Sequence, residues 1–427
     1  MQLTDVLTYH NGRLHLENIS LAALAEQMGT PVYVYSQTLL AANAQTVLTS
    51  IPPAPPDTLI CYAVKANANP ALLHLLGQYG FGADVTSGGE LFLAQHAGIP
   101  ADRIIFSGVG KTRPEIVMAI QAGIRALHVE SAVELETIAE IATAHCRKVR
   151  IGVRVNPDIS ADTHPYMSTG QKTHKFGVSP AQAIEILTKA ATHPWLEPVG
   201  LATHVGSQIR SLASFADVAC FLVDMAARLA AQGIRLEYLD VGGGLGIDYD
   251  GQGAPSLADW VTAVAPPIHQ AGYNLVMEPG RSIVGATGIL LTCVTTIKQQ
   301  GERTFVVVDA GMSDLIRPAL YNAYHAIWPV VAPPPGAPSL PVDVVGPICE
   351  TGDWLARERP FPPVRPGDLL AILHTGAYGF SMSSNYNGRL RPPEVLVHRD
   401  KWYTIRQRQD YHHLLDGCTP IQNLSEN

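Results

Sequence analysis

The chain has few cysteines, and they are widely scattered. Six occur in 427 residues, without a CxxC pair or a closely spaced framework. Disulfide-dependent domains need such spacings, so this usage is typical of a reducing compartment and predicts a cytoplasmic protein. The six are Cys61, Cys146, Cys220, Cys293, Cys349 and Cys418.

Long apolar runs and dense basic clusters are also missing. No apolar stretch reaches the roughly 18 residues that a membrane span needs, and the amino-terminal MQLTDVLTYHNG lacks the apolar region of a secretory signal. The 29 basic and 37 acidic residues give a net charge of -8, with no Lys/Arg cluster dense enough to follow a phosphate backbone. We therefore expect neither a membrane nor a nucleic acid as partner.

Metal-binding motifs are missing as well. The sequence contains neither HExxH nor a Cys/His cluster. His412 and His413 are adjacent in sequence, whereas two histidine ligands on a helix are spaced to share one face. We therefore expect no metal site.

What the chain does contain is a large apolar fraction and a repeating order of elements. With 47% hydrophobic residues and 427 positions it exceeds the size of one ordinary core, which predicts two domains. From Leu59 to Met277, short apolar runs alternate with turns and helix-like stretches, as in parallel strand-helix units. The predicted strands are Leu59–Val64, Gly82–Val85, Ile104–Phe106, Ala126–Val129, Val149–Val155, Val199–Thr203, Leu236–Val241 and Asn274–Met277, and the clearest helices are Gly89–Ala97, Val133–His145 and Phe215–Gln232.

Eight such units match a closed (β/α)8 TIM barrel better than an open sheet. After about Gly285 the pattern changes to β-branched runs separated by Pro and Gly, which predicts an antiparallel β domain. Pro-rich stretches at Ile51–Pro56, Ala332–Pro341 and Pro360–Pro366 are interpreted as connecting loops, with PxxP ligands as the alternative.

A polar residue or a glycine follows each predicted barrel strand. In a parallel barrel these positions meet at the carboxyl ends of the strands, where such folds keep their chemistry. The sequence therefore predicts one site at the barrel mouth. Its members, in strand order, are Lys65, Asp84 with Ser87, Ser107 with Gly108, Glu130, Asn156, His204, Gly242 to Gly244, and Glu278.

Lys65 ends the apolar run CYAVK, so its amine is expected to project into the barrel mouth. A desolvated lysine with a lowered pKa can form a Schiff base with a carbonyl group. The alternatives are a snorkelling lysine or a buried ion pair. The first interpretation requires a cofactor, and the other strand ends must supply its binding groups.

Three further motifs offer such groups. GGGLG at Gly242–Gly246 would let backbone N–H groups approach a phosphate, although a tight turn alone can also require glycines. EPGR at Glu278–Arg281 adds a carboxylate that could keep a pyridine nitrogen protonated, as pyridoxal phosphate chemistry needs, or could form a local ion pair. His204 is either a core histidine or a residue that stacks on an aromatic cofactor, with Ser207 donating to its phosphate.

Many ordered motifs carry a family resemblance. They include YAVKAN, SGGEL, FSGVGKT, RVNPD, HPYMSTGQKTHKFG, HVGSQI, DVGGGLGI, EPGRS, VDAGMSDLIRPALY, GPICETGD and GAYGFSMSSNYNGR. From about Thr30 to about Val397 the chain resembles the diaminopimelate decarboxylases, which are fold-type III pyridoxal-phosphate enzymes related to alanine racemase and to ornithine and arginine decarboxylases. The resemblance implies decarboxylation of meso-2,6-diaminopimelate to L-lysine and carbon dioxide, the last step of lysine biosynthesis.

The resemblance also implies an architecture and an assembly. A pyridoxal-phosphate-binding barrel would span residues 33–285, and residues 1–32 would join 286–427 in the alanine racemase-like β domain. The family forms homodimers with shared active sites, so the same assembly is expected here.

Residue roles follow from the same resemblance, position by position. Lys65 matches the lysine that binds the cofactor covalently, Glu278 the partner of the pyridine nitrogen and His204 the stacking residue. Cys349 is similar to the thiol proton donor, and Glu350 to the substrate-binding acid, that the partner subunit supplies. The implied catalytic residues are Lys65, Cys349 and His204. The implied cofactor-binding positions are Lys65, Asp84, His204, Ser207, Gly243, Gly244, Glu278, Gly280, Arg281 and Tyr378. The implied substrate-binding positions are Arg281, Arg317, Tyr321, Glu350 and Tyr378.

Alternatives remain at several of these positions. Thr351 stands where the family commonly has serine, and its extra methyl group could tighten the substrate pocket. Cys349 could instead be a small buried hydrophobe, and Arg317 could brace Asp314. The chain could also decarboxylate another basic amino acid or a related metabolite, or be a catalytically inactive homologue. A racemase is the last alternative, since those relatives lack the CETGD motif.

Overall fold

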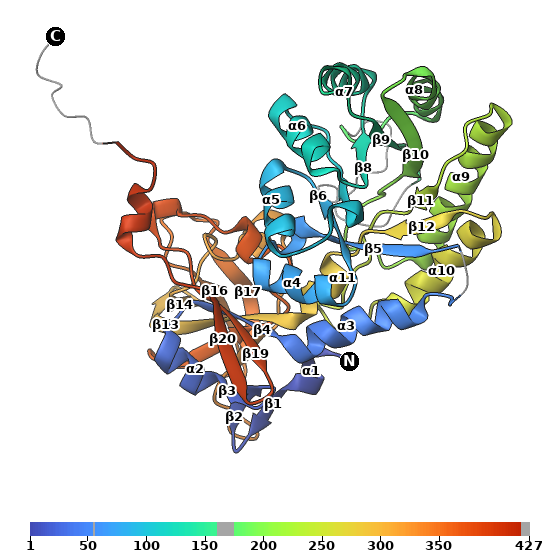
Figure 1. Cartoon of the computed structure of the whole chain (residues 1–427). Coiled ribbons are helices and arrows are strands. Elements are labelled where there is room, and N and C mark those ends of the chain that lie inside the picture. The colour runs from blue at the N-terminus through green and yellow to red at the C-terminus, as the bar shows by residue number, and fades with distance from the viewer. Residues whose placement is uncertain (54–55, 160–174, 420–427) are drawn as a thin grey trace, which may run out of the picture. The chain divides into compact units, whose positions relative to one another are not determined.

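The computed structural model describes residues 1–53, 56–159 and 175–419, which form two compact units (Figure 1). The first unit comprises Met1–Leu3, Gln37–Thr287 and Gly376–Ser381. The second comprises Thr4–Ser36, Gly288–Thr375 and the described residues from Met382 onward. Two sequence features lie partly outside the described residues: the motif at 164–177 and the Pro-rich stretch at 51–56.

The first unit is built on a closed barrel of parallel strands, which confirms the predicted TIM barrel. The strands are β5 (Thr58–Ala63), β6 (Gly82–Val85), β7 (Ile104–Phe106), β8 (Ala126–Val129), β9 (Val149–Arg154), β10 (Leu196–Ala202), β11 (Tyr238–Asp240) and β12 (Asn274–Met277). Neighbours in sequence are neighbours in the barrel, and β12 pairs with β5 to close it. Their carboxyl ends therefore meet at one mouth.

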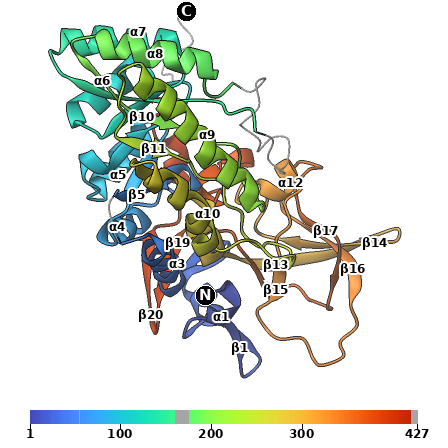
Figure 2. The same ribbon diagram turned by 90° about the vertical axis from the view of Figure 1, so that its right-hand side faces the viewer.

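Helices connect the strands (Figure 2). They are α3 (Gln37–Ser50), α4 (Pro70–Gln78), α5 (Gly88–His96), α6 (Arg113–Ala122), α7 (Ala132–Ala144), α8 (Pro180–Thr192), α9 (Leu212–Ala231), α10 (Leu257–Gln270) and α11 (Arg281–Val284), with 3-10 turns η1 (Val64–Ala66), η2 (Ala101–Arg103) and η4 (Gly285–Thr287). Ser87 and Ser131 begin α5 and α7, where each hydroxyl accepts a hydrogen bond from the third backbone N–H of its helix. Ser87, one of the predicted strand-end residues, is thus a helix cap.

Several predicted strand ends shift in the structure. Lys65 lies in the turn η1 and not on β5, which ends at Ala63. Strand β10 begins earlier than predicted, at Leu196, and its pairing with β9 is irregular between Pro198 and Gly200. The ends of these strands depend on how they pair with neighbouring strands. The local sequence carries no information about that pairing.

Two glycines make room for large polar residues inside the barrel. His128 on β8 and Tyr238 on β11 are both buried, and the His128 Nε2 atom lies 2.8 Å from the Tyr238 hydroxyl. A Cβ atom at Gly152 would lie within 3.0 Å of the His128 ring, and one at Gly200 within 3.0 Å of the Tyr238 ring. Glycine is therefore required on β9 and β10 by the side chains of other strands.

The second unit is a β domain. Its amino-terminal part has a three-stranded sheet of β1 (Leu7–His10), β2 (Arg13–Leu16) and β3 (Ile19–Ser20). The main sheet contains β4 (Val32–Ser36), β13 (Gly288–Gln300), β14 (Arg303–Val308), β15 (Ile327–Pro329), β16 (Leu340–Val345), β17 (Trp354–Phe361), β18 (Leu369–Ile372), β19 (Glu394–His398) and β20 (Lys401–Arg406). The other helical segments of this unit are α2 (Leu21–Met28), α12 (Arg317–Tyr321), η6 (Tyr386–Gly388) and η7 (Tyr411–Leu415), while α1 (Leu3–Val6) and η5 (Phe380–Met382) span the boundary between the two units.

The β domain contains two parallel pairs that the prediction of an antiparallel β domain did not include. Strand β14 pairs with β16 in parallel, and β4 pairs with β19 in parallel. The other pairs of this sheet are antiparallel. Parallel neighbours need a long connection. Here the chain passes through α12 and β15 between β14 and β16, whereas β4 and β19 come from opposite ends of the sequence.

No helix in the described part of the chain is both long and apolar enough to cross a membrane.

Gly200→Ala is expected to destabilise the protein by about 1 to 3 kcal/mol, because the new methyl group would overlap the buried Tyr238 ring. Urea unfolding followed by circular dichroism would measure this change. Gly110→Ala is the matched control, since a Cβ atom there would meet nothing within 4 Å. Equal unfolding free energies for the two variants would show that the barrel interior adjusts freely to the added methyl group.

Candidate active site

Lys65 and Asp84 form an ion pair at the barrel mouth. The Lys65 Nζ atom in η1 lies 2.6 Å from Oδ2 of Asp84 on β6. The Asp84 side chain is fully buried, whereas the Lys65 side chain is 34% exposed. The ion pair that was the alternative for Lys65 is therefore present, and it aims the amine at the mouth.

The charges at the mouth set the proton affinity of Lys65. Burial alone would lower the pKa of this amine, but the nearby carboxylates of Asp84 and Glu278 outweigh burial and raise it. The lowered pKa that the Schiff-base interpretation of Lys65 invoked is therefore not found in this arrangement. Burial likewise acts to raise the pKa of Asp84, yet the Lys65 charge and its hydrogen bond lower it overall. The pair thus holds Lys65 as an ammonium group beside an ionised carboxylate.

A buried guanidinium lies near three hydroxyl-bearing side chains. Arg281, at the start of α11, donates hydrogen bonds to the Ser207 Oγ atom at 2.9 Å and to the Tyr249 hydroxyl at 2.8 Å. Its Cζ atom lies 4.8 Å from the centroid of the Tyr378 ring. A guanidinium among hydroxyl groups suits a phosphate, since all of these groups can donate hydrogen bonds to its oxygens. Tyr249 was not predicted from the sequence.

The glycines beside this group pack closely against backbone. A Cβ atom at Gly243 would lie within 3.0 Å of the Glu278 carbonyl oxygen, and one at Gly244 within 3.0 Å of the Gly206 carbonyl oxygen. Gly244 also has a φ of +107°, which favours glycine. A Cβ atom at Gly280 would lie 3.0 Å from the Ala63 Cβ atom. Steric crowding therefore explains why glycine occupies these positions. Because glycine has no side chain, the backbone groups at these positions also stay accessible.

His204 is a neutral imidazole. The backbone N–H of Gly243 donates to its Nδ1 atom at 3.1 Å, so the ring proton belongs on Nε2. Desolvation, followed by the charges of Arg154 and Lys65, lowers the pKa of His204 to about 3. A flat, uncharged ring held in this way can stack on an aromatic cofactor.

Glu278 belongs to a group of buried acids. Its side chain follows β12, with the Ser107 Oγ atom 3.5 Å from Oε1. Burial, and then the charges of Asp240 and Asp84, raise the pKa of Glu278 well above its usual value. Ligand atoms of His128, Asp240 and Glu278 all lie within 4.8 Å of one another. Such a trio is also a possible metal ligand set, so the absence of a metal site stays a prediction.

Asp240 and His128 were missed as site residues from the sequence. Asp240 is the last residue of β11, whose sequence is YLD and whose residues are all buried. An acidic residue at the end of a buried strand was the sequence signal that could have identified it. Its carboxyl group accepts a hydrogen bond from the Gly242 backbone N–H at 2.8 Å. The first unit thus brings together Lys65, Asp84, His204, Ser207, Gly243, Gly244, Glu278, Gly280, Arg281 and Tyr378.

The other four predicted residues belong to the second unit. Arg317, at the start of α12, is 2% exposed, and its Nη1 atom lies 2.8 Å from Nε2 of His325. Nδ1 of His325 lies 2.7 Å from the Leu373 carbonyl oxygen, which can only accept. His325 therefore carries its proton on Nδ1 and accepts from Arg317 through Nε2. Tyr321 ends the same short helix.

Cys349 and Glu350 are exposed on the connection between β16 and β17. The Cys349 backbone N–H donates to the Asn387 side-chain oxygen at 2.7 Å. The Tyr386 hydroxyl donates to Glu350 at 3.0 Å. Because Cys349 is exposed in this chain, the alternative that it is a small buried hydrophobic residue is excluded for the single chain. Thr351 beside them is also exposed.

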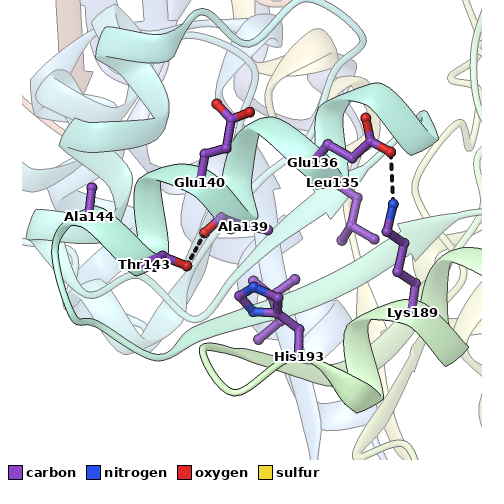
Figure 3. A pocket seen from close by; sticks show the side chains of 9 residues that line it. Leu135, Glu136, Ala139, Glu140, Thr143, Ala144, Lys189 and His193 are labelled. Carbon is purple, nitrogen blue, oxygen red and sulfur yellow. Dashed lines mark hydrogen bonds and ion pairs between the residues drawn. The ribbon is translucent and has the colours of Figure 1, made fainter.

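A groove on the outside of the barrel is a separate feature (Figure 3). It has a volume of about 590 Å³ and lies between α7 and α8. Two of its polar groups pair with each other, since the Lys189 Nζ atom lies 2.7 Å from Glu136. None of the residues predicted to act in catalysis lines this groove. The chemical site is therefore assigned to the barrel mouth.

Comparisons with known proteins identify the family of the chain. Residues 40–285 match the family model described as "Pyridoxal-dependent decarboxylase, pyridoxal binding domain". The chain is 44% identical over 416 residues to diaminopimelate decarboxylase of Aquifex aeolicus, which covers 97% of this chain and 98% of that one. The crystal structure of diaminopimelate decarboxylase from M. jannaschii in co-complex with L-lysine superposes with a TM-score of 0.93 at 35% identity and covers 99% of both chains.

A second solved structure leads to the same family. Diaminopimelate decarboxylase from Helicobacter pylori, complexed with L-lysine, superposes with a TM-score of 0.88 at 39% identity and covers 92% of this chain and 98% of that one. The similarity thus includes both units of the fold as well as the strand ends that form the barrel mouth. The chain belongs to the diaminopimelate decarboxylases, a family of pyridoxal-dependent decarboxylases with a TIM barrel and a β domain.

Proposed function

We propose that the protein decarboxylates meso-2,6-diaminopimelate to L-lysine and carbon dioxide with pyridoxal 5'-phosphate as cofactor, the last step of lysine biosynthesis. The observation that carries this proposal is the similarity to diaminopimelate decarboxylases over 97% of the chain, with Lys65 and Glu278 at the barrel mouth. Two related structures contain L-lysine, the product of this reaction. The substrate is a small polar molecule, and the protein is expected in the cytoplasm.

The residues at the mouth have the chemistry to hold this cofactor. Lys65 would bind its aldehyde carbon after passing its extra proton to the paired Asp84 carboxylate, and the aldehyde oxygen would leave as water. Arg281 and Ser207, helped by Tyr378 and the backbone groups of Gly243, Gly244 and Gly280, would hold the phosphate. His204 would stack on the ring, and the Glu278 carboxylate would hold a proton on the ring nitrogen.

When bound, the cofactor supplies an aromatic ring that accepts the electron pair of the breaking carbon–carbon bond. The protein's part is to orient the scissile carboxylate and to deliver a proton. Cys349 would then transfer its thiol proton to the α carbon that has lost carbon dioxide. An unperturbed thiol is mostly protonated at neutral pH and can act as this acid.

Substrate selection would depend on the far end of the molecule. Diaminopimelate has an ammonium and a carboxylate there, whereas lysine and ornithine have only an ammonium. The planar guanidinium of Arg317, oriented by its hydrogen bond with His325, suits the far carboxylate. Tyr321, Glu350, Tyr378 and Arg281 are the other proposed substrate contacts.

The assembly that we propose is a homodimer with shared active sites. Cys349 and Glu350 of each subunit would complete the site in the barrel of its partner, which accounts for a catalytic thiol on an exposed loop. In this arrangement residues 33–285 form the cofactor-binding domain, and residues 1–32 and 286–427 form the β domain.

The purified protein, loaded with pyridoxal phosphate and incubated with meso-diaminopimelate, is expected to release carbon dioxide and L-lysine in equal amounts. Amino-acid analysis and carbon dioxide release would measure both products. Lysine, ornithine and arginine, tested in parallel, should react at least about a hundredfold more slowly as judged by kcat/KM. Preference for one of these would support the alternative substrate class. A cofactor-loaded protein that turns over none of them would be an inactive homologue.

Arg317→Ala is expected to raise KM for meso-diaminopimelate by at least about tenfold, because the far carboxylate would lose its charged, two-pronged partner. Arg317→Lys should recover only part of this loss, since an ammonium lacks the planar fork. Steady-state kinetics with the thermal midpoint of each variant would separate binding from folding. Arg365→Ala, at an exposed arginine of the same unit, is the control. Wild-type kinetics for Arg317→Ala would remove Arg317 from substrate recognition.

Mixing Lys65→Ala with Cys349→Ala tests the shared site. Each variant alone should be inactive, but subunit exchange should restore about a quarter of the wild-type activity, because mixed dimers hold one site with both native residues. The control mixes Lys65→Ala with the double variant, in which no site can be complete. Absence of recovery after proven subunit exchange would place both residues of each site in one chain.

A further inference from the structure

The thiol loop, residues 346–353, connects β16 to β17 and carries Cys349. Its last residue, Asp353, is only 4% exposed. The Asp353 carboxylate accepts hydrogen bonds from the backbone N–H groups of Ile348 at 2.7 Å and of Met312 at 2.6 Å. Asp353 therefore anchors the thiol loop to the interior of the second unit as far as Ile348, the residue that directly precedes Cys349.

The next two residues of the thiol loop are exposed, and side chains of η6 hold them. The Asn387 Oδ1 atom accepts a hydrogen bond from the Cys349 backbone N–H at 2.7 Å. The Tyr386 hydroxyl donates to Oε2 of Glu350 at 3.0 Å. Two neighbouring residues of η6 thus contact two neighbouring residues of the loop, and these are the two that were predicted to act at the partner's site.

The segment that leads into η6 is itself bound to other parts of the second unit. The Ser384 backbone N–H donates to the Ser313 carbonyl oxygen at 2.9 Å. The Asn385 side-chain amide donates to the Gln409 side-chain oxygen at 2.6 Å. Because η6 is anchored in this way, a hydrogen bond from η6 can fix the position of the thiol loop.

The backbone of Asn387 has a conformation that suits asparagine. Its φ is +56° and its ψ is +24°, in the left-handed region, and Gly388 follows with a φ of +66°. Among residues other than glycine, asparagine is one of the few that adopt this conformation readily. Glycine would fit the same backbone but would lack the oxygen that accepts from Cys349. The role of the side chain can therefore be tested apart from that of the backbone.

Proton transfer from Cys349 requires its sulfur to lie close to one carbon atom of the substrate, and such steps depend strongly on geometry. The contacts of Asp353 end at Ile348, whereas Asn387 binds the backbone of Cys349 itself. We propose that Asn387 is a positioning residue that holds the Cys349 backbone so that its thiol meets the α carbon that has lost carbon dioxide. The inference rests on the proposed function, because it takes Cys349 as the proton donor.

Asn387→Gly removes the acceptor oxygen and leaves a positive φ accessible. In the cofactor-loaded protein it should lower kcat for meso-diaminopimelate by at least about tenfold, because the thiol is no longer held in place. KM and the affinity for pyridoxal phosphate should stay within about threefold of wild type, since Tyr386 still holds Glu350 and the proposed cofactor-binding residues lie in the first unit. Unchanged kcat in steady-state kinetics, with or without a change in KM, would overturn the proposal.

Two further variants separate the acceptor oxygen from the turn. Asn387→Asp keeps an acceptor oxygen and also tolerates a positive φ, so it should keep kcat within about threefold of wild type. Asn11→Gly is the matched control, because Asn11 is exposed, has a φ of +49° and precedes Gly12 at +73°. It should have wild-type kinetics. A loss of kcat in either variant as large as that in Asn387→Gly would contradict a specific role for the Asn387 oxygen.

Mixed dimers show on which chain Asn387 acts. When Lys65→Ala is mixed with Cys349→Ala, the one complete site uses the thiol of the Lys65→Ala chain. Asn387→Gly added to that chain should therefore lower the recovered activity by the same factor as kcat. Added instead to the Cys349→Ala chain, it should leave the recovered activity unchanged, because that chain supplies no thiol. Equal losses in the two mixtures, or a loss only in the second, would overturn the proposal.

Failure of the proposed function would look different. Wild type would then bind no pyridoxal phosphate or release no carbon dioxide from meso-diaminopimelate. If only the sharing of sites failed, the mixture without Asn387→Gly would show no recovery, and the kcat of Asn387→Gly alone would still test the positioning role. Size-exclusion chromatography and thermal midpoints would establish that each variant is a folded protein with the wild-type assembly.

Discussion

The site depends on the burial of acids around a single lysine amine. Asp84 binds Lys65 directly. This one contact orients the amine, and it leaves the carboxyl groups of Asp240 and Glu278 without a lysine of their own to balance their charge. In water three carboxylates at this spacing would all ionise, but in a desolvated barrel mouth the cost of their charges is high. Burial therefore raises the pKa of both Asp240 and Glu278 above their usual values.

The barrel provides this environment through packing as much as through charge. Gly152 and Gly200 have no side chains, and this leaves the space that the rings of His128 and Tyr238 occupy inside the barrel. Closure by pairing of β12 with β5 brings Glu278 and Lys65, which are far apart in sequence, to the same end of adjacent strands. In the second unit, His325 orients Arg317 through hydrogen bonds. Nδ1 of His325 donates to the Leu373 carbonyl oxygen, and its Nε2 atom accepts a hydrogen bond from Arg317.

The sequence predicted the architecture well because its information is local and repeated. Strands β6, β7, β8 and β12 have the predicted bounds, since each is a short apolar run between clear turns. The early start of strand β10 and the parallel pairs of the β domain were not predicted, because these bounds and directions depend on partners distant in the chain. The ten predicted cofactor-binding residues all lie in the first unit, including Tyr378, which had been predicted to belong to the β domain, and their roles stay predictions.

By itself the sequence determined the barrel, the family and the place of Lys65 after the first barrel strand, because these follow from periodicity and from motifs that are contiguous in the chain. Only the tertiary structure decided that Lys65 is a paired ammonium with a raised pKa and that Asp240 and His128 belong to the site. The physical reason is that proton affinity depends on burial and on the distances between charges, and both exist only after strands from different parts of the chain have packed together.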